Sequence, residues 1–219
     1  MIYIQKGKEP DSLTAYKKQA YASYEGYEEK EELREALLKD QGYICAYCMR
    51  RIKNDRKSMK IEHWKAQSKL ETEEEKLDFR FMLGVCDGCR GSADQYTTCD
   101  EHRHNAELYV NPLDSTMMDT IGYDRNGHIK SGDSRIDEDL NDILNLNCEQ
   151  APSQIVLNRK NIYAECKNQL MKIQARGIWK KSTLQKVMRQ YERRKDGRNP
   201  EYVGVPLFLL NKYMRKCQG

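Results

Sequence analysis

The chain carries Cys45-Ala46-Tyr47-Cys48, Cys86-Asp87-Gly88-Cys89 and Cys99-Asp100, and this series of cysteines decides the fold. Ile61-Glu62-His63-Trp64 lies between the first two members of the series. Two cysteines separated by two residues turn both sulfur atoms toward one point, which is the geometry of a zinc knuckle. The sequence therefore predicts a structural Zn²⁺ that holds together a small fold around an acidic residue and a histidine.

Spacing alone leaves the fourth zinc ligand open. Cys45 and Cys48 supply two ligands, and Cys86 is the obvious third. Cys89 completes a second CxxC pair and is favoured by spacing, whereas Cys99 would close the site across the intervening loop. The remaining cysteines are isolated in sequence of helical character and are predicted to be packing residues: Cys148, Cys166 and Cys217.

A carboxylate and an imidazole that suit catalysis are adjacent at Glu62 and His63, in a segment predicted to be a strand over 59–64. A neutral imidazole accepts a proton from water near pH 7, and a carboxylate oxygen binds a hard cation such as Mg²⁺. Adjacent side chains on a strand point to opposite faces. Both residues can therefore serve one site only if the strand ends or bulges at His63.

Asp100 and His104 provide a second pair of candidate metal ligands. Residues four apart on a helix share a face, so both side chains can reach one metal ion if this segment is helical. The alternative for Asp100 is a carboxylate that stabilises the first turn of a helix. We favour the metal-ligand interpretation.

Length and composition limit the class of protein. A chain of 219 residues with 38% hydrophobic residues forms one domain, or one domain with a helical extension. Eight cysteines are typical of metal ligands rather than disulfides in an intracellular chain. The sequence has no run of about 18 apolar residues, and Met1-Ile2-Tyr3-Ile4-Gln5-Lys6 lacks the apolar region of a signal peptide. We therefore expect a cytoplasmic protein without a membrane partner.

Positive charge is concentrated near the end of the chain. Residues 153–219 contain 16 Lys and Arg but only 4 Asp and Glu, although the net charge of the whole chain is only +4. Such a segment follows a phosphate backbone, docks on an acidic partner, or forms solvated helix faces. The candidate nucleic-acid contacts are Lys180, Lys181, Arg193 and Arg194, with Lys186, Arg189 and Lys195 as further members.

Sequence patterns also predict the order of the elements. Helices are expected over 13–24, 28–40, 137–145, 153–175, 182–193 and 205–216, with Gly42 just after the second of them. A short strand is expected over 107–110, and a hairpin over 121–129 with Asn126-Gly127 in its turn. These elements divide the chain into a helical arm (1–42), a core with the zinc knuckles (43–135) and a basic helical segment (136–219).

Several motifs together resemble one known family. They are Met1-Ile2-Tyr3-Ile4, Leu33-Arg34-Glu35-Ala36-Leu37-Leu38, Tyr43-Ile44-Cys45-Ala46-Tyr47-Cys48-Met49, Lys60-Ile61-Glu62-His63-Trp64, Leu83-Gly84-Val85-Cys86-Asp87-Gly88, Cys99-Asp100, Asn111-Pro112-Leu113-Asp114 and Ile143-Leu144-Asn145-Leu146-Asn147. Over about residues 1–160 the chain resembles the HNH nuclease subunit PtuB of Septu anti-phage systems and its retron-associated relatives. The resemblance implies an α+β fold with a ββα-metal core and a structural zinc.

The resemblance also assigns ligands. Cys99-Asp100-Glu101-His102-Arg103 resembles the Cys-Asn-x-x-Lys ending of the HNH pattern, with Asp for Asn and Arg for Lys. It makes Cys99 the fourth zinc ligand and Asp100 a ligand of the catalytic metal, and it leaves Cys89 in a loop. One position departs from the pattern: Phe81 stands where HNH proteins usually have an Asn that orients the histidine. Asn105 and Asn111 are the candidates to replace it.

The activity that the resemblance implies is metal-dependent hydrolysis of phosphodiester bonds in DNA or tRNA. His63 would be the general base, and Glu62 and Asp100, with His104, would hold a catalytic Mg²⁺ or Mn²⁺. Arg103 would neutralise phosphate charge. The implied partner is an ABC-type ATPase subunit like PtuA, joined in some systems by a retron reverse transcriptase with its DNA–RNA hybrid.

The alternative function is a zinc-stapled module that docks nucleic acid or the ATPase without cleaving either. Phe81 favours this alternative, and Glu62, His63 and Asp100 together favour the nuclease.

Overall fold

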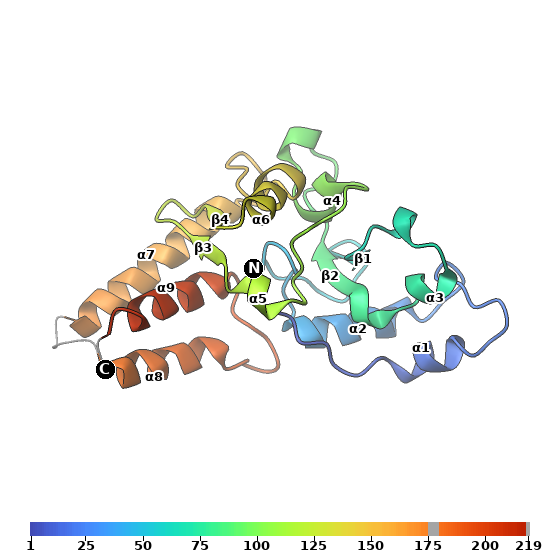
Figure 1. Ribbon diagram of the computed structural model, residues 1–219, viewed down its shortest axis with the longest axis horizontal. Helices are drawn as coiled ribbons and strands as arrows, with labels where there is room; N and C mark the ends of the chain where they lie inside the picture. Colours follow the sequence, from blue (N-terminus) through green and yellow to red (C-terminus); the bar gives the residue numbers. More distant parts are fainter. Residues whose placement is uncertain (175–179, 218–219) are drawn as a thin grey trace.

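Two short antiparallel strand pairs and a larger set of helices make up the structure, a computed structural model that describes residues 1–174 and 180–217 (Figure 1). In the first pair, β1 (Met59–His63) pairs with β2 (Met82–Cys86), so that His63 lies opposite Met82 and Met59 opposite Cys86. In the second, β3 (Ile121–Tyr123) pairs with β4 (Ile129–Ser131). The expected α+β class is confirmed, with helix as the larger component.

The helices are distributed along the whole chain. They are α1 (Asp11–Tyr16), α2 (Lys30–Gln41), α3 (Glu73–Lys76), α4 (Cys99–Arg103), α5 (Ser115–Met118), α6 (Ser134–Glu138), α7 (Ile155–Gln174), α8 (Lys181–Glu192) and α9 (Gly204–Met214). A turn of π-helix over Asp139–Ile143 extends α6. The short helix α4 packs against β2, so that β1, β2 and α4 form one local unit.

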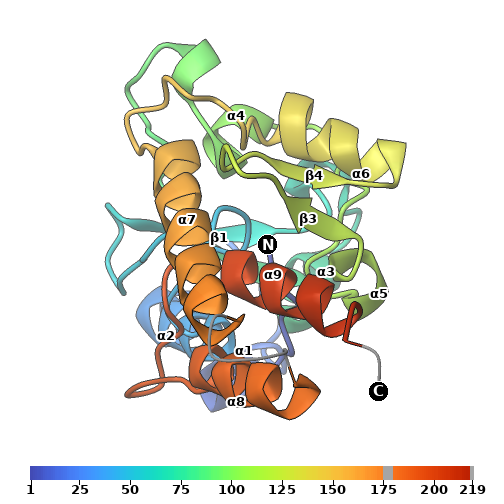
Figure 2. The ribbon, with the colours of Figure 1, turned by 90° about the vertical axis from the view of Figure 1, so that its left-hand side faces the viewer.

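The hydrophobic core joins distant parts of the chain. Its main cluster takes buried side chains from α2, from both strand pairs and from the start of α9, and Leu33, Val85 and Val205 have no exposed surface. A smaller cluster lies among α7, α8 and α9, which Figure 2 shows side by side. The main cluster therefore includes residues from all three of the segments expected from the sequence.

The C-terminal segment is fastened to the end of α2. Arg194 donates from Nη1 to the carbonyl oxygen of Lys39 at 2.5 Å and from Nη2 to that of Asp40 at 2.7 Å. The backbone N–H of Asn199 donates to the carbonyl oxygen of Gly42 at 2.9 Å. The last carbonyl groups of a helix lack partners within the helix. Here they receive donors from a segment about 150 residues further along the chain.

Local rules predicted many elements correctly. Gly42 follows α2 with a φ of 65°, and the β3–β4 turn contains Asn126 and Gly127, the latter at φ 89°. The helix expected over 13–24 begins two residues earlier and ends at Tyr16. The helix expected over 153–175 spans Ile155–Gln174, and residue 175 lies outside the described residues.

The strand expected over 107–110 does not form. The backbone N–H groups of Tyr109 and Val110 instead both donate to Oδ2 of Asp139 at 2.6 Å, so a side chain takes the place of a neighbouring strand. In the part of the chain that the structure describes, no helix combines the length and apolar character needed to cross a membrane.

Candidate metal centre and carboxylate site

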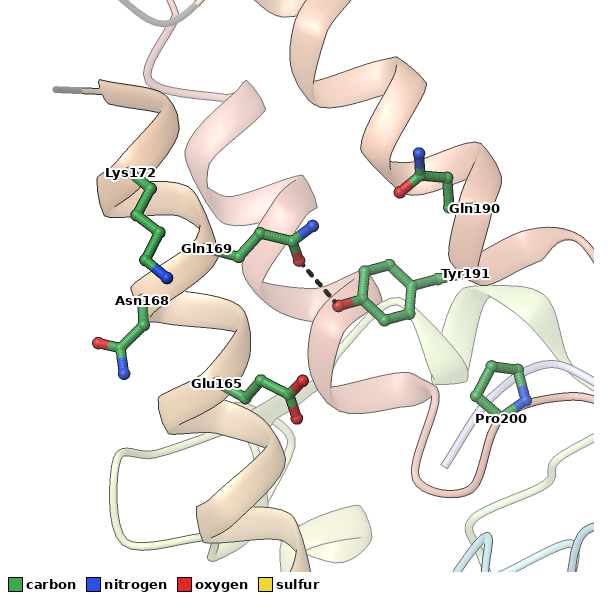
Figure 3. Close-up of a pocket in the computed structure, with 7 residues that line it drawn as sticks. All are labelled: Glu165, Asn168, Gln169, Lys172, Gln190, Tyr191 and Pro200. Atoms are coloured by element: carbon green, nitrogen blue, oxygen red, sulfur yellow. Dashed lines mark hydrogen bonds between the residues drawn. The ribbon is translucent and has the colours of Figure 1, made fainter. Parts of the chain in front are cut away.

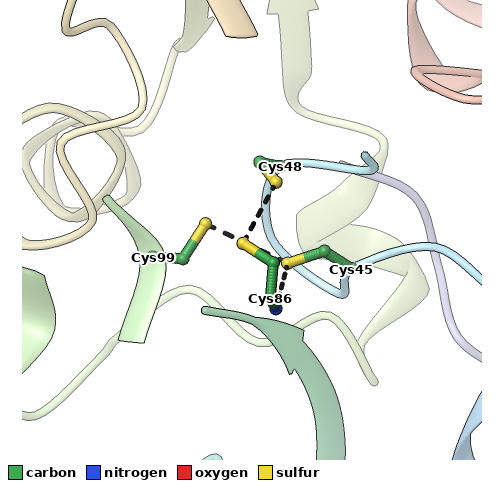
Figure 4. Close-up of side chains that lie close together, drawn as sticks. All are labelled: Cys45, Cys48, Cys86 and Cys99. Carbon is green, nitrogen blue, oxygen red and sulfur yellow. Dashed lines mark hydrogen bonds between the residues drawn. The ribbon is translucent and has the colours of Figure 1, made fainter. Parts of the chain in front are cut away.

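Four cysteines converge at the centre of the fold (Figure 4). The Sγ atoms of Cys45, Cys48, Cys86 and Cys99 all lie within 4.8 Å of one another, and all four residues are buried. Cys48 Sγ lies 3.7 Å from Cys86 Sγ, and Cys45 Sγ lies 4.0 Å from Cys99 Sγ. Zn–S bonds of about 2.3 Å in a tetrahedron place two sulfur atoms about 3.8 Å apart, whereas a disulfide holds them at about 2.0 Å. The cluster thus fits a structural Zn²⁺.

Three different segments of the chain position the four ligands. Cys45 and Cys48 lie in the turn after α2, Cys86 ends β2, and Cys99 begins α4. The backbone N–H of Cys86 donates to Cys45 Sγ at 3.4 Å, the type of hydrogen bond that orients a thiolate ligand. Cys89 lies outside the cluster. The preference for Cys89 that came from spacing alone is therefore wrong for this structure, because the chain returns to the cluster only at Cys99.

Gln41 holds the first knuckle against β2, which the sequence analysis did not anticipate. Its side chain is buried and donates from Nε2 to the carbonyl oxygens of Ile44 at 2.8 Å and Gly84 at 2.7 Å. Its Oε1 accepts from the N–H of Gly84 at 2.6 Å. The signal in the sequence was a lone amide in the last turn of a helix that precedes a CxxC pair, which is too common to be diagnostic.

A carboxylate pair lies between β1 and α4. Glu62 and Asp100 share a hydrogen bond, and Glu62 also accepts one from the hydroxyl of Tyr47 at 3.4 Å. The pKa of Glu62 is raised from 4.5 to about 9 by burial, by the hydrogen bond to Asp100 and by the negative charge of Asp100, against the opposing effect of Arg103. The pair therefore holds one proton near pH 7, which a bound cation would replace.

Arg103 is not available to a phosphate group. Its side chain is only 1% exposed and forms a salt bridge with Glu62. Its other N–H groups donate to the carbonyl oxygens of Ala106 at 2.8 Å, His63 at 3.1 Å and Trp64 at 2.7 Å. The expectation that Arg103 neutralises substrate charge is therefore corrected: this guanidinium group ties α4 to the end of β1.

The side chain of His63 leaves β1 on the face opposite Glu62. Its ring packs edge-on against Tyr24, with ring centroids 4.7 Å apart, and its Nε2 donates to the carbonyl oxygen of Lys76 at 2.7 Å. Burial lowers the pKa of His63, so the ring is neutral near pH 7. With the proton on Nε2, Nδ1 carries a lone pair. β1 ends at His63, as a shared site requires, but the two side chains make no direct contact with each other in the described structure.

His104 does not share a helix face with Asp100. α4 ends at Arg103, and His104 follows with a φ of 51° and a ψ of −116°. Its Nε2 lies 3.0 Å from Oδ1 of Asp94, and its side chain is 65% exposed. The expectation that His104 joins Asp100 at one metal is therefore corrected, because the helix that would align the two residues is one residue too short.

Lys60 belongs to the carboxylate site, although the sequence analysis did not include it. It contacts Asp100 and Glu101, the second and third residues of α4. Because side chains alternate along a strand, Lys60 and Glu62 leave β1 on the same face. The two-residue spacing of Lys60 and Glu62 in a predicted strand could have indicated that Lys60 lies beside the carboxylate site.

Four candidate basic residues of the C-terminal segment lie at the two ends of α8, and Lys186 and Arg189 lie within the helix. Lys180 and Lys181 lie at its start, and Arg193 and Arg194 follow its end. A helix of this length spans about 18 Å. Lys180, Lys181 and Arg193 are exposed, whereas the guanidinium group of Arg194 is bound to the end of α2. Lys180 and Lys181 are therefore separated from Arg193 by the length of α8.

A groove of about 750 Å³ lies between α7 and α8, at the end of the molecule away from β1 and β2 (Figures 1 and 3). Its lining residues are Glu165, Asn168, Gln169, Lys172, Gln190, Tyr191 and Pro200. The hydroxyl of Tyr191 donates to Oε1 of Gln169 at 3.2 Å. One acidic and one basic side chain face this groove, so it carries no charge preference and lies apart from the metal centre.

Comparison with known proteins adds no assignment to this geometry. No protein-family model matches the chain, and a search of curated proteins found no match.

Proposed function

We propose that the protein is an HNH-type endonuclease subunit that hydrolyses phosphodiester bonds with the help of a divalent metal. The observation that carries the proposal is the contact between Glu62 and Asp100 directly beside the four-cysteine cluster. One carboxylate comes from a strand that ends in a histidine, and the other from a helix that begins with a zinc ligand. In this proposal β1, β2 and α4 are the ββα-metal core.

Glu62 and Asp100 fit a hard divalent cation because they offer carboxylate oxygens and share a proton that such an ion would displace. The chemistry that Mg²⁺ or Mn²⁺ supplies when bound is stabilisation of charge on the phosphate and on the leaving oxygen. His104 takes no part, because its side chain faces Asp94.

His63 is the general base in this mechanism. Its lowered pKa keeps the ring neutral, and the hydrogen bond from Nε2 to Lys76 leaves Nδ1 free to accept a proton from the attacking water. The carbonyl of Lys76 also fixes the orientation of the ring, which in the HNH pattern is the task of the Asn that Phe81 replaces. In this proposal the backbone carbonyl of Lys76 thus takes over the role of the Asn that is absent at Phe81.

DNA and tRNA both remain substrates of the proposed reaction, since both present the phosphodiester that it attacks. The resemblance to PtuB over about residues 1–160 supports an ABC-type ATPase as the partner, with a retron reverse transcriptase in some complexes, and a role in anti-phage defence. The exposed cations Lys180, Lys181 and Arg193 support contact with nucleic acid or with an acidic face of the partner.

A non-catalytic binding module is the second candidate function. It is favoured by the opposite orientations of Glu62 and His63 on β1 and by the exposed ring of Phe81, which is 42% accessible where the HNH pattern has a polar residue. In that case the zinc cluster would stabilise a docking surface for nucleic acid or for the ATPase.

Cleavage assays with Mg²⁺ or Mn²⁺ on plasmid DNA and on tRNA, with the ATPase partner present, separate the two functions. We expect cleavage by the wild type, and loss of at least about a hundredfold in rate for His63→Ala. His102→Ala is the matched control, since His102 lies on α4 and bonds to Thr97 rather than to the carboxylate pair. Equal activity of His63→Ala and His102→Ala would exclude the general-base role, and no cleavage by the wild type would favour the binding module.

A further inference from the structure

The ammonium group of Lys60 lies at the solvent-facing side of the carboxylate pair. Its Nζ donates to Oδ2 of Asp100 at 3.1 Å and also binds Oε2 of Glu101. The side chains of Lys60, Asp100 and Glu101 are 22%, 18% and 24% exposed, whereas that of Glu62 is 11% exposed. Of these four side chains, that of Glu62 is thus the least accessible to solvent.

Among residues 1–174 and 180–217, Lys60 and Arg103 are the cations that bond to the pair, and they differ in freedom to move. Arg103 is enclosed, and four of its N–H donors are held by Glu62 and by backbone carbonyls. In the described part of the chain the ammonium group of Lys60 bonds only to side chains of α4, and it sits on a flexible four-carbon stem. Of the two, only Lys60 can leave its carboxylate without disturbing the buried core.

We propose that Lys60 neutralises Asp100 while no divalent cation is bound, and that it binds the substrate phosphate once such a cation has replaced it at Asp100. This role rests on the function proposed above. Glu101 keeps the ammonium group beside the site after it leaves Asp100, because Glu101 is its second partner. Binding of the cation would release the proton shared by Glu62 and Asp100 to solvent, and no other covalent bond would form or break in either step.

Charge supports this order of events. A divalent cation needs both Glu62 and Asp100 as anions, and a lysine ammonium on Asp100 competes for the same oxygen. A phosphodiester bound to that cation then presents further negative charge, which a nearby ammonium stabilises most strongly at a partly buried site. Lys60 thus weakens the binding of the free metal and strengthens the binding of nucleic acid.

The proposal is tested by whether removing the charge of Lys60 changes Mn²⁺ affinity and DNA affinity in opposite directions. Mn²⁺ binding to zinc-loaded protein is followed by the electron paramagnetic resonance signal of free Mn²⁺, and binding of a short fluorescein-labelled DNA duplex by anisotropy in saturating Mn²⁺. All variants carry His63→Ala, so that the duplex stays intact. Lys60→Met is expected to bind Mn²⁺ about tenfold more tightly and DNA about tenfold more weakly.

Two matched variants show whether the charge at Lys60 is responsible. Lys60→Arg keeps the charge and should restore Mn²⁺ affinity to within about threefold of that of the His63→Ala parent, which has Lys60 unchanged. Arg90→Ala removes a different cation from Glu101, 3.3 Å from its Oε2, and should change Mn²⁺ affinity less than about twofold because Arg90 forms no ion pair with Asp100 in the described structure. Zinc content and melting temperature confirm that each variant is folded.

The outcomes distinguish this role from the proposed function itself. If Glu62→Gln abolishes Mn²⁺ binding but Lys60→Met leaves Mn²⁺ or DNA affinity unchanged, the metal site stands and the role of Lys60 is overturned. If Lys60→Met weakens both, Lys60 only positions Asp100, and the role is again overturned. If neither the parent nor Lys60→Met binds Mn²⁺, the catalytic metal of the proposed function fails, and the role of Lys60 fails with it.

Discussion

Arg103, the last residue of α4, directs its guanidinium group onto the carboxyl group of Glu62 on β1, and both residues are buried. The same group bonds to the carbonyls of His63 and Trp64, where the strand ends. One side chain thus fixes the helix that carries Asp100 against the strand that carries Glu62. The arrangement of the carboxylate pair depends on this link, although Arg103 itself faces no ligand.

Replacing Arg103 with Met should destabilise the protein by about 3 kcal/mol, because the buried carboxyl group of Glu62 and three carbonyl groups lose their partner. Arg103→Lys should recover less than half of this stability, since one ammonium cannot reproduce the planar fork of donors. Chemical denaturation of zinc-loaded protein measures both. Wild-type stability of Arg103→Lys would contradict this account.

The pKa of Glu62 predicts how stability depends on pH. A carboxyl group whose pKa is raised from 4.5 to about 9 binds its proton more tightly in the folded than in the unfolded chain. Its contribution to stability is therefore fully present below pH 4.5 and is lost as the pH rises toward 9, by at most about 1.4 kcal/mol per pH unit. In buffer free of Mg²⁺ and Mn²⁺, the zinc-loaded wild type should lose stability between pH 4.5 and about 9 relative to zinc-loaded Glu62→Gln. Parallel curves for the two proteins would show that Glu62 is ionised at neutral pH.

The fourth zinc ligand can be tested with a pair of neighbouring cysteines. Cys99→Ser should lower zinc content and stability, because metal-binding energy is folding energy in such a site. Cys89→Ser should retain one zinc per chain, since Cys89 is buried but lies outside the cluster. Elemental analysis of the purified proteins gives the answer, and zinc loss in Cys89→Ser alone would reverse the assignment.

Features set by local rules could be predicted from the sequence. The CxxC turn, Gly42 after α2 and the Asn126-Gly127 hairpin each follow from the conformations that a few adjacent residues prefer. The salt bridge and the burial of Arg103 could not be predicted from the sequence. Its partner Glu62 is 41 residues away, and the burial of its guanidinium group depends on how α4 packs. The end of α4 was not predicted for a similar reason: His104 leaves the helix and pairs with Asp94, in the short 3-10 helix that precedes α4.

Arg194 and its neighbour Arg193 should behave differently. Arg194→Ala should lower the melting temperature by about 3 °C, because the carbonyls of Lys39 and Asp40 lose their donors. Arg193→Ala is the control, since Arg193 is exposed and bonds through its backbone to Arg189. Differential scanning calorimetry compares them. Equal melting temperatures would mean that the remaining hydrogen bonds to α2, such as that of Asn199, are enough to hold the C-terminal segment.

The exposed cations at the two ends of α8 allow a choice between nucleic acid and protein as the ligand of this segment. Lys180, Lys181 and Arg193 are available, and changing all three to Glu leaves the zinc cluster and the hydrogen bonds of Arg194 intact. If these cations bind duplex phosphates, the slope of log affinity against log salt should flatten by about 0.9 for each phosphate that is no longer neutralised.

Binding of a DNA duplex is therefore measured for wild type and triple variant over a series of salt concentrations, in parallel with co-purification of the ATPase partner. Arg194 is left unchanged, because its replacement would lower the stability of the fold as well as its charge. We expect the ATPase to be lost and the slope to be retained, since the three cations are split across about 18 Å of helix and the carboxylate site lies in a different part of the chain. A flattened slope with the ATPase still bound would instead make the ends of α8 part of the path that the substrate follows.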